Sequence, residues 1–203
     1  MKRVLSVLTM LAALAGSASA AGYVLPPYQA GALQPSDWMP SYNIEGLYAV
    51  GQADTPDAWG VRGSFSLYDD GNGAVRHQFS ISIAAEFGSD TYEDLGVKIN
   101  QDMWMMPITG AYDMNIGITD SVYLDLGVRA GWAMGSYEES VMDAKWEEDF
   151  NGFTVGVGAG IKIFCSERLY VKVGYEFNRT FVHDDIGENL TQHVISAGIG
   201  TAF

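Results

Sequence analysis

The strongest constraint in this sequence is a two-residue alternation of apolar with polar or small side chains. In residues 122–132, for example, Val122 and Leu124 alternate with Tyr123 and Asp125. Successive side chains of a β-strand point to opposite faces, so alternation over nine or more residues predicts a strand rather than a helix. The same pattern occupies residues 59–67, 75–87, 122–132, 153–163 and 169–177.

Three less regular segments raise the predicted number of strands to eight. Residues 42–51 and 192–203 alternate less completely, and residues 102–115 are the least regular because 103–106 is apolar on both faces. An even number of strands would return both chain ends to the same side of a closed sheet. In 102–115 we place Trp104, Met106, Ile108, Tyr112 and Met114 on the outer face and Thr109, Asp113 and Asn115 on the inner face.

The predicted connections between these strands differ in length and charge. Short ones are expected at 69–73, which contains the turn-forming run Asp-Asp-Gly-Asn-Gly, and at 117–120 and 165–168. Short connections at one end and long ones at the other are typical of membrane-spanning barrels, with the short ones in the periplasm. Longer connections rich in Asp and Glu are expected at 88–98, 136–149 and 179–190, and one of modest length at 52–57.

The start of the chain is predicted to lie outside the folded domain. In residues 1–20, a short basic start precedes an apolar run over 4–14, and an Ala-Ser-Ala pattern ends at Ala20. This is the layout of a secretory signal, and the apolar run is shorter than the about 20 residues that a spanning helix needs. We expect cleavage after Ala20. Residues 21–40 contain four prolines and are expected to form an extended leader, followed by the folded domain over 41–203.

The two strand faces distinguish a membrane barrel from a soluble one. Opposite the apolar face lie many small residues, such as Gly156, Gly158 and Gly160, with a few charges. Small side chains fit the narrow lumen of an eight-stranded barrel and would make a poor solvated exterior. Besides the helix, only a closed barrel satisfies every backbone group in lipid. We therefore predict an all-β fold, an eight-stranded antiparallel up-and-down transmembrane β-barrel.

The chain ends on an alternating strand that an aromatic residue closes. Phe203 follows Ile195, Ala197 and Ile199 at alternate positions and resembles the assembly signal of bacterial outer-membrane proteins, although Thr201 departs from the bulky residue often found there. With its signal, eight strands and glycine-rich inner face, the chain resembles the outer-membrane β-barrel superfamily of opacity-protein and OmpA/OmpX-type domains. The resemblance implies insertion into a Gram-negative-type outer membrane by the outer-membrane assembly machinery, among lipid and lipopolysaccharide.

Charged residues on the small-residue face are the most specific feature of the sequence. Both signs occur there in nearly equal number. Charge inside a barrel must pair or stay hydrated, so we interpret these residues as a network of ion pairs and hydrogen bonds that fills the lumen. The alternative is a gate in a narrow channel. The predicted lumen residues are Glu45, Arg62, Arg76, Glu86, Asp125, Arg129, Lys162, Lys172 and Glu176.

Enzymatic and metal-binding functions find little support in the sequence. A lipid hydrolase or acyltransferase needs His with Ser and a carboxylate or amide, but His193 and Ser196 fall on opposite faces of their strand. His77 lies on the apolar face, near a short connection. His183, with two aspartates after it, could help to hold Ca²⁺, yet no EF-hand spacing is present, and a solvated acidic loop is the preferred interpretation. The single Cys165 cannot form an internal disulfide.

The net charge of the chain limits the kinds of molecule that it is expected to bind. The formal net charge is −14, and about −16 once Lys2 and Arg3 leave with the signal, which argues against nucleic acid as a partner. We therefore predict a non-enzymatic outer-membrane protein without a metal or cofactor. It would contribute to envelope structure or surface interaction through acidic extracellular loops. A small low-conductance channel and a lipid-modifying outer-membrane enzyme are the alternatives.

Overall fold

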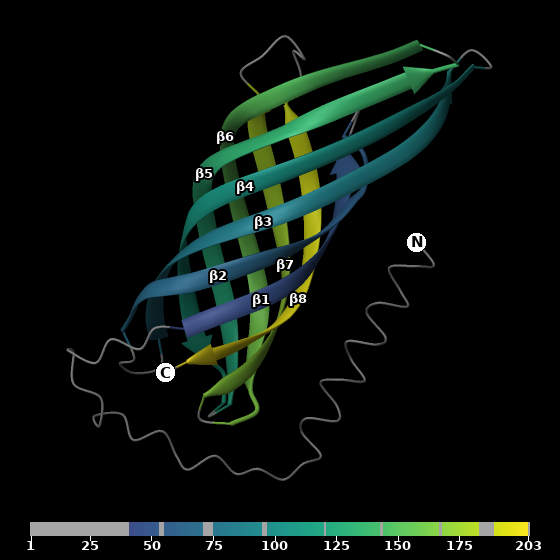
Figure 1. Cartoon of the computed structure of the whole chain (residues 1–203). Coiled ribbons are helices and arrows are strands. Elements are labelled where there is room, and N and C mark those ends of the chain that lie inside the picture. The colour runs from purple at the N-terminus through teal and green to yellow at the C-terminus, as the bar shows by residue number, and fades with distance from the viewer. Residues whose placement is uncertain are drawn as a thin grey trace.

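The protein folds into a closed barrel of eight strands, each antiparallel to its neighbours, as a computed structural model of the chain shows (Figure 1). β1 pairs with β8, from Ser41 opposite Ala202 to Gln52 opposite Thr191, and this pairing closes the ring. The predicted all-β fold class is confirmed. The strands are β1 (Ser41–Gln52), β2 (Ala58–Asp70), β3 (Val75–Asp94), β4 (Val97–Gly117), β5 (Val122–Val141), β6 (Ala144–Phe164), β7 (Leu169–Val182) and β8 (Leu190–Ala202).

The structure describes residues 41–52, 55–70, 75–94, 97–119, 121–142, 144–166, 168–182 and 189–202. The predicted signal and leader (1–40), the assembly residue Phe203, and His183 with the two aspartates after it lie outside these residues. No helix long and apolar enough to span a membrane occurs among the described residues.

The apolar face of the barrel points outward. Val157 in β6 and Ile199 in β8 are 56% and 60% exposed. The outer and inner assignments made for residues 102–115 are confirmed, with Trp104 and Ile108 exposed and Thr109, Asp113 and Asn115 buried. Burial of small and polar side chains inside, with apolar side chains outside, is the arrangement of a barrel that lies in lipid.

Four strands are much longer than the others. β3, β4, β5 and β6 have 20 or 21 residues, whereas the other strands have 12 to 14. The hairpins β3–β4 and β5–β6 consequently project past the rest of the barrel as one four-stranded sheet, at the upper right of Figure 1. We call this sheet the extension, and its end of the barrel the hairpin end. The opposite end, where Ser41 pairs with Ala202, is the terminal end.

The prediction of long connections at 88–98 and 136–149 is wrong. β3 and β4 are separated by residues 95–96 alone, and β5 and β6 by 142–143 alone. The backbone pairing continues where both faces of the sheet meet water, so the side chains become polar on both faces. The apolar alternation that marks a strand in lipid is then lost, although the ladder itself persists.

The lumen also contains an apolar layer, which the alternating pattern did not predict. Leu47, Met103, Met105, Phe150 and Val194 are buried and pack together. Strand register places Leu47 opposite Gly60, Gly60 opposite Glu86, and Glu86 opposite Met105, so the layer lies towards the hairpin end. Apolar residues on both faces of 103–106 were the signal for it. The full layer comprises Leu47, Ala49, Ala58, Ala84, Met103, Met105, Ala133, Phe150, Leu190 and Val194.

Candidate functional site

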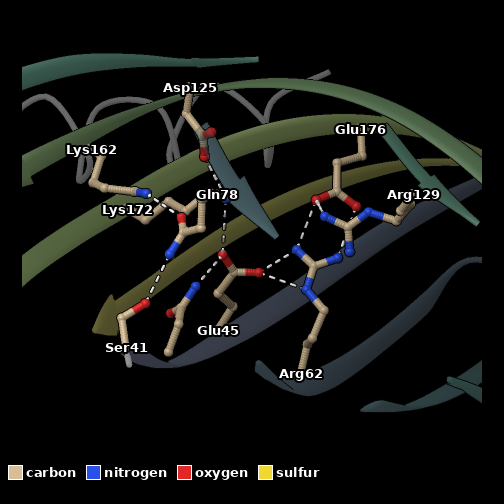
Figure 2. Close-up of polar contacts among 10 residues, drawn as sticks. Ser41, Glu45, Arg62, Gln78, Asp125, Arg129, Lys162, Lys172 and Glu176 are labelled. Atoms are coloured by element: carbon tan, nitrogen blue, oxygen red, sulfur yellow. Dashed lines mark hydrogen bonds and ion pairs between the residues drawn. The ribbon is translucent and has the colours of Figure 1, made fainter. Parts of the chain in front are cut away.

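Between the apolar layer and the terminal end, charged side chains occupy the lumen, and Figure 2 shows the contacts among them. All nine residues predicted to face the lumen lie on the inward-facing register of their strands. Glu45 and Arg62 are only 1% and 4% exposed. Asp113, assigned to the inner face but not to the charged set, is buried beside them. With it, the described residues that face the lumen include five anions and five cations.

Arg62 is the centre of the largest group of ion pairs. Its Nε donates a hydrogen bond to Glu45 Oε2 at 2.7 Å, and its Nη2 contacts the same oxygen. Its Nη1 and Nη2 donate to the two carboxylate oxygens of Glu176, each at 2.8 Å. Arg129 Nη2 donates to Glu176 Oε1 at 2.6 Å. Arg62 on β2 and Glu176 on β7 thus meet across the lumen and tie non-adjacent strands together.

A second group forms around Lys172. Its Nζ lies 2.5 Å from Asp125 Oδ2 and 3.9 Å from Glu45 Oε1, so Glu45 joins the two groups. Towards the terminal end, Lys162 Nζ donates to Gln78 Oε1 at 3.1 Å, and Gln78 Nε2 donates to Ser41 Oγ at 2.8 Å. The Lys162–Gln78–Ser41 contacts link β6, β3 and β1 as a separate polar chain beside the Lys172 group (Figure 2).

Arg76 and Glu86 are lumen residues that the structure does not bring into these two groups. Arg76 is buried near the terminal end, in a space lined by Asn115, Tyr123 and Lys162. Glu86 is buried level with the apolar layer, and no ion pair among the described residues includes it. The charged set therefore spans the height of the lumen, and the ion pairs around Arg62 and Lys172 lie in its middle.

Glycines make room for these long side chains. A Cβ atom on Gly156 would lie 2.1 Å from Asn178 Oδ1 and 2.9 Å from Arg129 Cγ. One on Gly198 would lie 2.7 Å from Glu45 Cγ. The glycine-rich inner face is thus complementary to the charged side chains that fold against it.

Little free space remains in the charged part of the lumen. Its cavities have volumes of about 20, 10 and 10 Å³. A single water needs roughly 10–15 Å³, so each cavity holds one or two waters at most. The cavities described between the charged side chains are therefore too small to form an open passage through that part of the lumen.

The family of the chain follows from comparison of its sequence with protein-family models. The model described as outer membrane protein beta-barrel domain matches residues 4–203. The chain belongs to this family. Membership confirms the family resemblance drawn from the strand layout and assigns the protein to a Gram-negative outer membrane. No curated protein sequence matches the chain.

Solved structures of outer-membrane barrels resemble this fold at low sequence identity. Neisserial surface protein A (NspA) is 17% identical with a TM-score of 0.51, over 82% of this chain and 97% of NspA. The N-terminal β-barrel domain of Pseudomonas aeruginosa OprF is 21% identical with a TM-score of 0.46, over 80% and 97% of the two chains. Ail, the attachment invasion locus protein of Yersinia pestis, is 14% identical with a TM-score of 0.48, over 81% and 97%.

The histidines described in this family member lie on the outer wall. His77 Nδ1 lies 2.6 Å from Tyr112 Oη, and the two rings stack. His193 contacts Gln52 and lies 2.5 Å from Tyr175 Oη through its Nδ1. Ser196 is buried in the lumen, on the other side of the barrel wall from His193. Among the described residues, no group of His, Cys, Asp or Glu has the arrangement of a metal site.

Proposed function

We propose that this protein is a non-enzymatic integral outer-membrane barrel that contributes to envelope structure or surface interaction through its extension. The observation that carries the proposal is the division of the molecule into a filled barrel and a projecting acidic sheet. The barrel interior is occupied by ion pairs and an apolar layer, so it offers no wide passage. The extension instead presents a large hydrated surface beyond the lipid-facing wall.

The extension is rich in acid on both of its faces. Asp102, Glu138 and Glu147 lie on the face that continues the outer wall, and Glu139 and Glu148 lie on the face that continues the lumen side. Two lysines, Lys98 and Lys145, offset part of this charge. Such a surface stays solvated, repels anions and attracts cationic groups. It replaces the acidic loops expected from the sequence as the part of the protein that would meet partners.

The proposed orientation directs the extension outside the cell and the terminal end towards the periplasm. It is supported by the terminal end, where the first strand begins at Ser41 and the last strand finishes at Ala202, as expected for the periplasmic side of a barrel with an even number of strands. Single cysteines test it. Met142, 83% exposed at the tip of the β5–β6 hairpin, is replaced by Cys in a Cys165→Ser background, and native Cys165, exposed in the β6–β7 turn, is the matched control.

An impermeant thiol reagent applied to intact cells should modify the cysteine at position 142. It should modify Cys165 only after the outer membrane is permeabilised. The reverse pattern would contradict the proposed orientation and, with it, a surface role for the extension.

A small channel is the second candidate, because charges of both signs line the lumen. The apolar layer at Met105 and Phe150 argues against steady conduction, since an ion crossing it would lose hydration against mostly apolar side chains, with Glu86 as an acidic group at the same level. Planar-bilayer recording of the refolded protein tests this candidate. We expect small, brief or absent conductance, and steady porin-sized currents would favour the channel and contradict the filled lumen.

Catalysis is the third candidate and has the least support. A hydrolase of the His–Ser type would need both groups on one side of the wall, whereas His193 faces outward and Ser196 inward. Assay of phospholipid and lipopolysaccharide hydrolysis by the refolded protein should give no turnover above that of a His193→Ala variant.

We also propose that the chain reaches the membrane as a precursor. Loss of residues 1–20 after Ala20 is supported by the composition of that segment alone. Determination of the amino-terminal sequence of the membrane-bound protein tests it, with Ala21 expected as the first residue.

A further inference from the structure

A groove of about 360 Å³ lies on the outer wall, at the foot of the extension. It is formed by β2, β3, β4, β5 and β6, where the lipid-facing apolar surface gives way to the acidic surface of the extension. The position matters because a molecule in the groove would touch both the hydrocarbon edge of the membrane and water. Pockets that bind small molecules are of this size or larger.

One wall of the groove is aromatic. Trp59 and Phe87 are cross-strand partners with ring centroids 5.5 Å apart, and Phe87 is in turn the partner of Trp104. All three side chains are exposed. Indole and phenyl faces attract both alkyl chains and cations, the latter through the ring quadrupole.

The other wall is acidic. Asp102 is the cross-strand partner of Glu138, and Glu138 is the partner of Glu147, so three carboxylates stand side by side on one face. Like charges directly opposite each other destabilise a sheet. A bound cation would relieve that repulsion, so the empty groove favours a positively charged ligand.

An ammonium group already sits on this wall. Lys145 Nζ lies 2.7 Å from Glu138 Oε2, and that hydrogen bond raises the pKa of Lys145. Lys145 lies at ion-pair distance from only one of the three carboxylates among the contacts described, and its side chain is mostly exposed. It shows that the wall accepts an ammonium, and it makes Lys145 a tethered competitor for any free one.

We infer that this groove binds a membrane-partitioned amphiphile whose headgroup is an ammonium and carries no anion. The ammonium would lie against Asp102 and Glu147, and the alkyl chain would run along Trp59, Phe87 and Trp104 towards the lipid. A phosphate-bearing lipid is disfavoured because its anion would meet the carboxylates. A bare metal ion is disfavoured because these side chains do not converge as metal ligands among the described residues.

The inference names a ligand class for the acidic extension and so rests on the proposed function. The two are separable, because the side of the membrane is tested by thiol labelling in cells, whereas ligand binding is tested on purified protein. If the labelling test failed, the binding result would still hold, and the reverse is also true.

The test uses a brominated alkyltrimethylammonium, which quenches indole fluorescence on contact, and a neutral brominated alkyl glucoside of the same chain length. The protein is refolded into phosphatidylcholine vesicles with Trp38, Trp132 and Trp146 changed to Phe, so that Trp59 and Trp104 emit. We compare the ratio of probe to vesicle lipid at which half of the tryptophan fluorescence is quenched. For the cationic probe we expect this ratio to be several-fold lower than for the glucoside. Equal quenching by the two probes would overturn the inference.

Charge variants give the decisive comparison. Glu147→Gln and Glu148→Gln remove the same charge from adjacent residues of β6, but only Glu147 faces the groove. The first should weaken binding about two- to five-fold, the change expected for one exposed ion pair, and the second should leave it nearly unchanged. Lys145→Met should strengthen binding by a similar factor. Equal effects of the two Gln variants, or weaker binding by Lys145→Met, would contradict an ammonium site.

Discussion

The ion pairs of Arg62 make a quantitative prediction about the stability of the barrel. Arg62 donates hydrogen bonds to both Glu45 and Glu176 and is almost fully buried. Replacement by Met keeps much of the side-chain volume but removes the charge and every donor. Two buried carboxylates then lose their shared cation, although Glu176 keeps Arg129 and Glu45 keeps the more distant Lys172.

Removal of one partner from a buried ion pair costs about 3–5 kcal/mol, because the remaining charge is left uncompensated. The retained contacts of Arg129 and Lys172 prevent the cost from doubling, so we expect Arg62→Met to lower the free energy of unfolding by that amount. The double variant Arg62→Met/Glu45→Gln removes one cation together with one anion. It should be less destabilised than Arg62→Met alone, since one buried charge no longer lacks its partner.

Equilibrium urea unfolding of the refolded protein in vesicles measures these values. With a slope of about 2 kcal/mol/M, a loss of 4 kcal/mol moves the midpoint by roughly 2 M. Arg179→Met is the control, because Arg179 is exposed on the outer face and contacts only the Phe181 ring at 5.2 Å among the contacts described for it. If Arg62→Met matched this control, or if the double variant were the least stable, the lumen charges would not stabilise the barrel by pairing.

Three further changes test the lipid face, the lumen and the chain end. Val157→Arg, on the exposed apolar wall, should cost about 2–4 kcal/mol in the same unfolding assay if it lies near the bilayer midplane. Gly156→Ala should cost about 1–3 kcal/mol because its Cβ would collide with Asn178 and Arg129, whereas Gly63→Ala, with nothing within 4 Å of its Cβ, should be neutral or slightly stabilising. Deletion of Phe203 should reduce the heat-modifiable, folded protein recovered from outer membranes, and an unchanged yield would exclude its role in assembly.

The strands and their faces could be predicted from the sequence because lipid imposes one rule on every spanning residue. An outward side chain is apolar and an inward one is small or polar, so even the irregular residues 102–115 were assigned correctly. The rule fails where lipid ends. Thr91 and Asn100 face outward in the extension and are hydrogen-bonded to each other at 2.9 Å, yet nothing in their hydropathy distinguishes this paired strand from a loop.

Partners inside the lumen could not be predicted for a different reason. Arg62 and Glu176 are 114 residues apart and lie on strands that do not pair, so their contact depends on the stagger of the whole barrel. Hydropathy also gives the wrong expectation for the part of the lumen near the hairpin end. Leu47 and Val194 occupy inward positions that the pattern reserves for small or polar residues, because their layer fills the barrel above the ion pairs.

The lumen has an apolar layer towards the hairpin end and ion pairs towards the terminal end, and this order indicates which part of the protein could serve a function beyond stability. An ion approaching from the hairpin end meets Met105 and Phe150 before it meets any paired charge, and an ion from the other end meets Arg76 and Lys162, whose neighbours already fill the space. The described lumen residues carry equal numbers of opposite charges, so they provide no net charge to draw ions of one sign through. The inside of the barrel is therefore arranged to hold its own shape. The asymmetric charge of the protein lies instead on the extension, where it is exposed to partners and where the acidic groove meets the aromatic edge of the membrane.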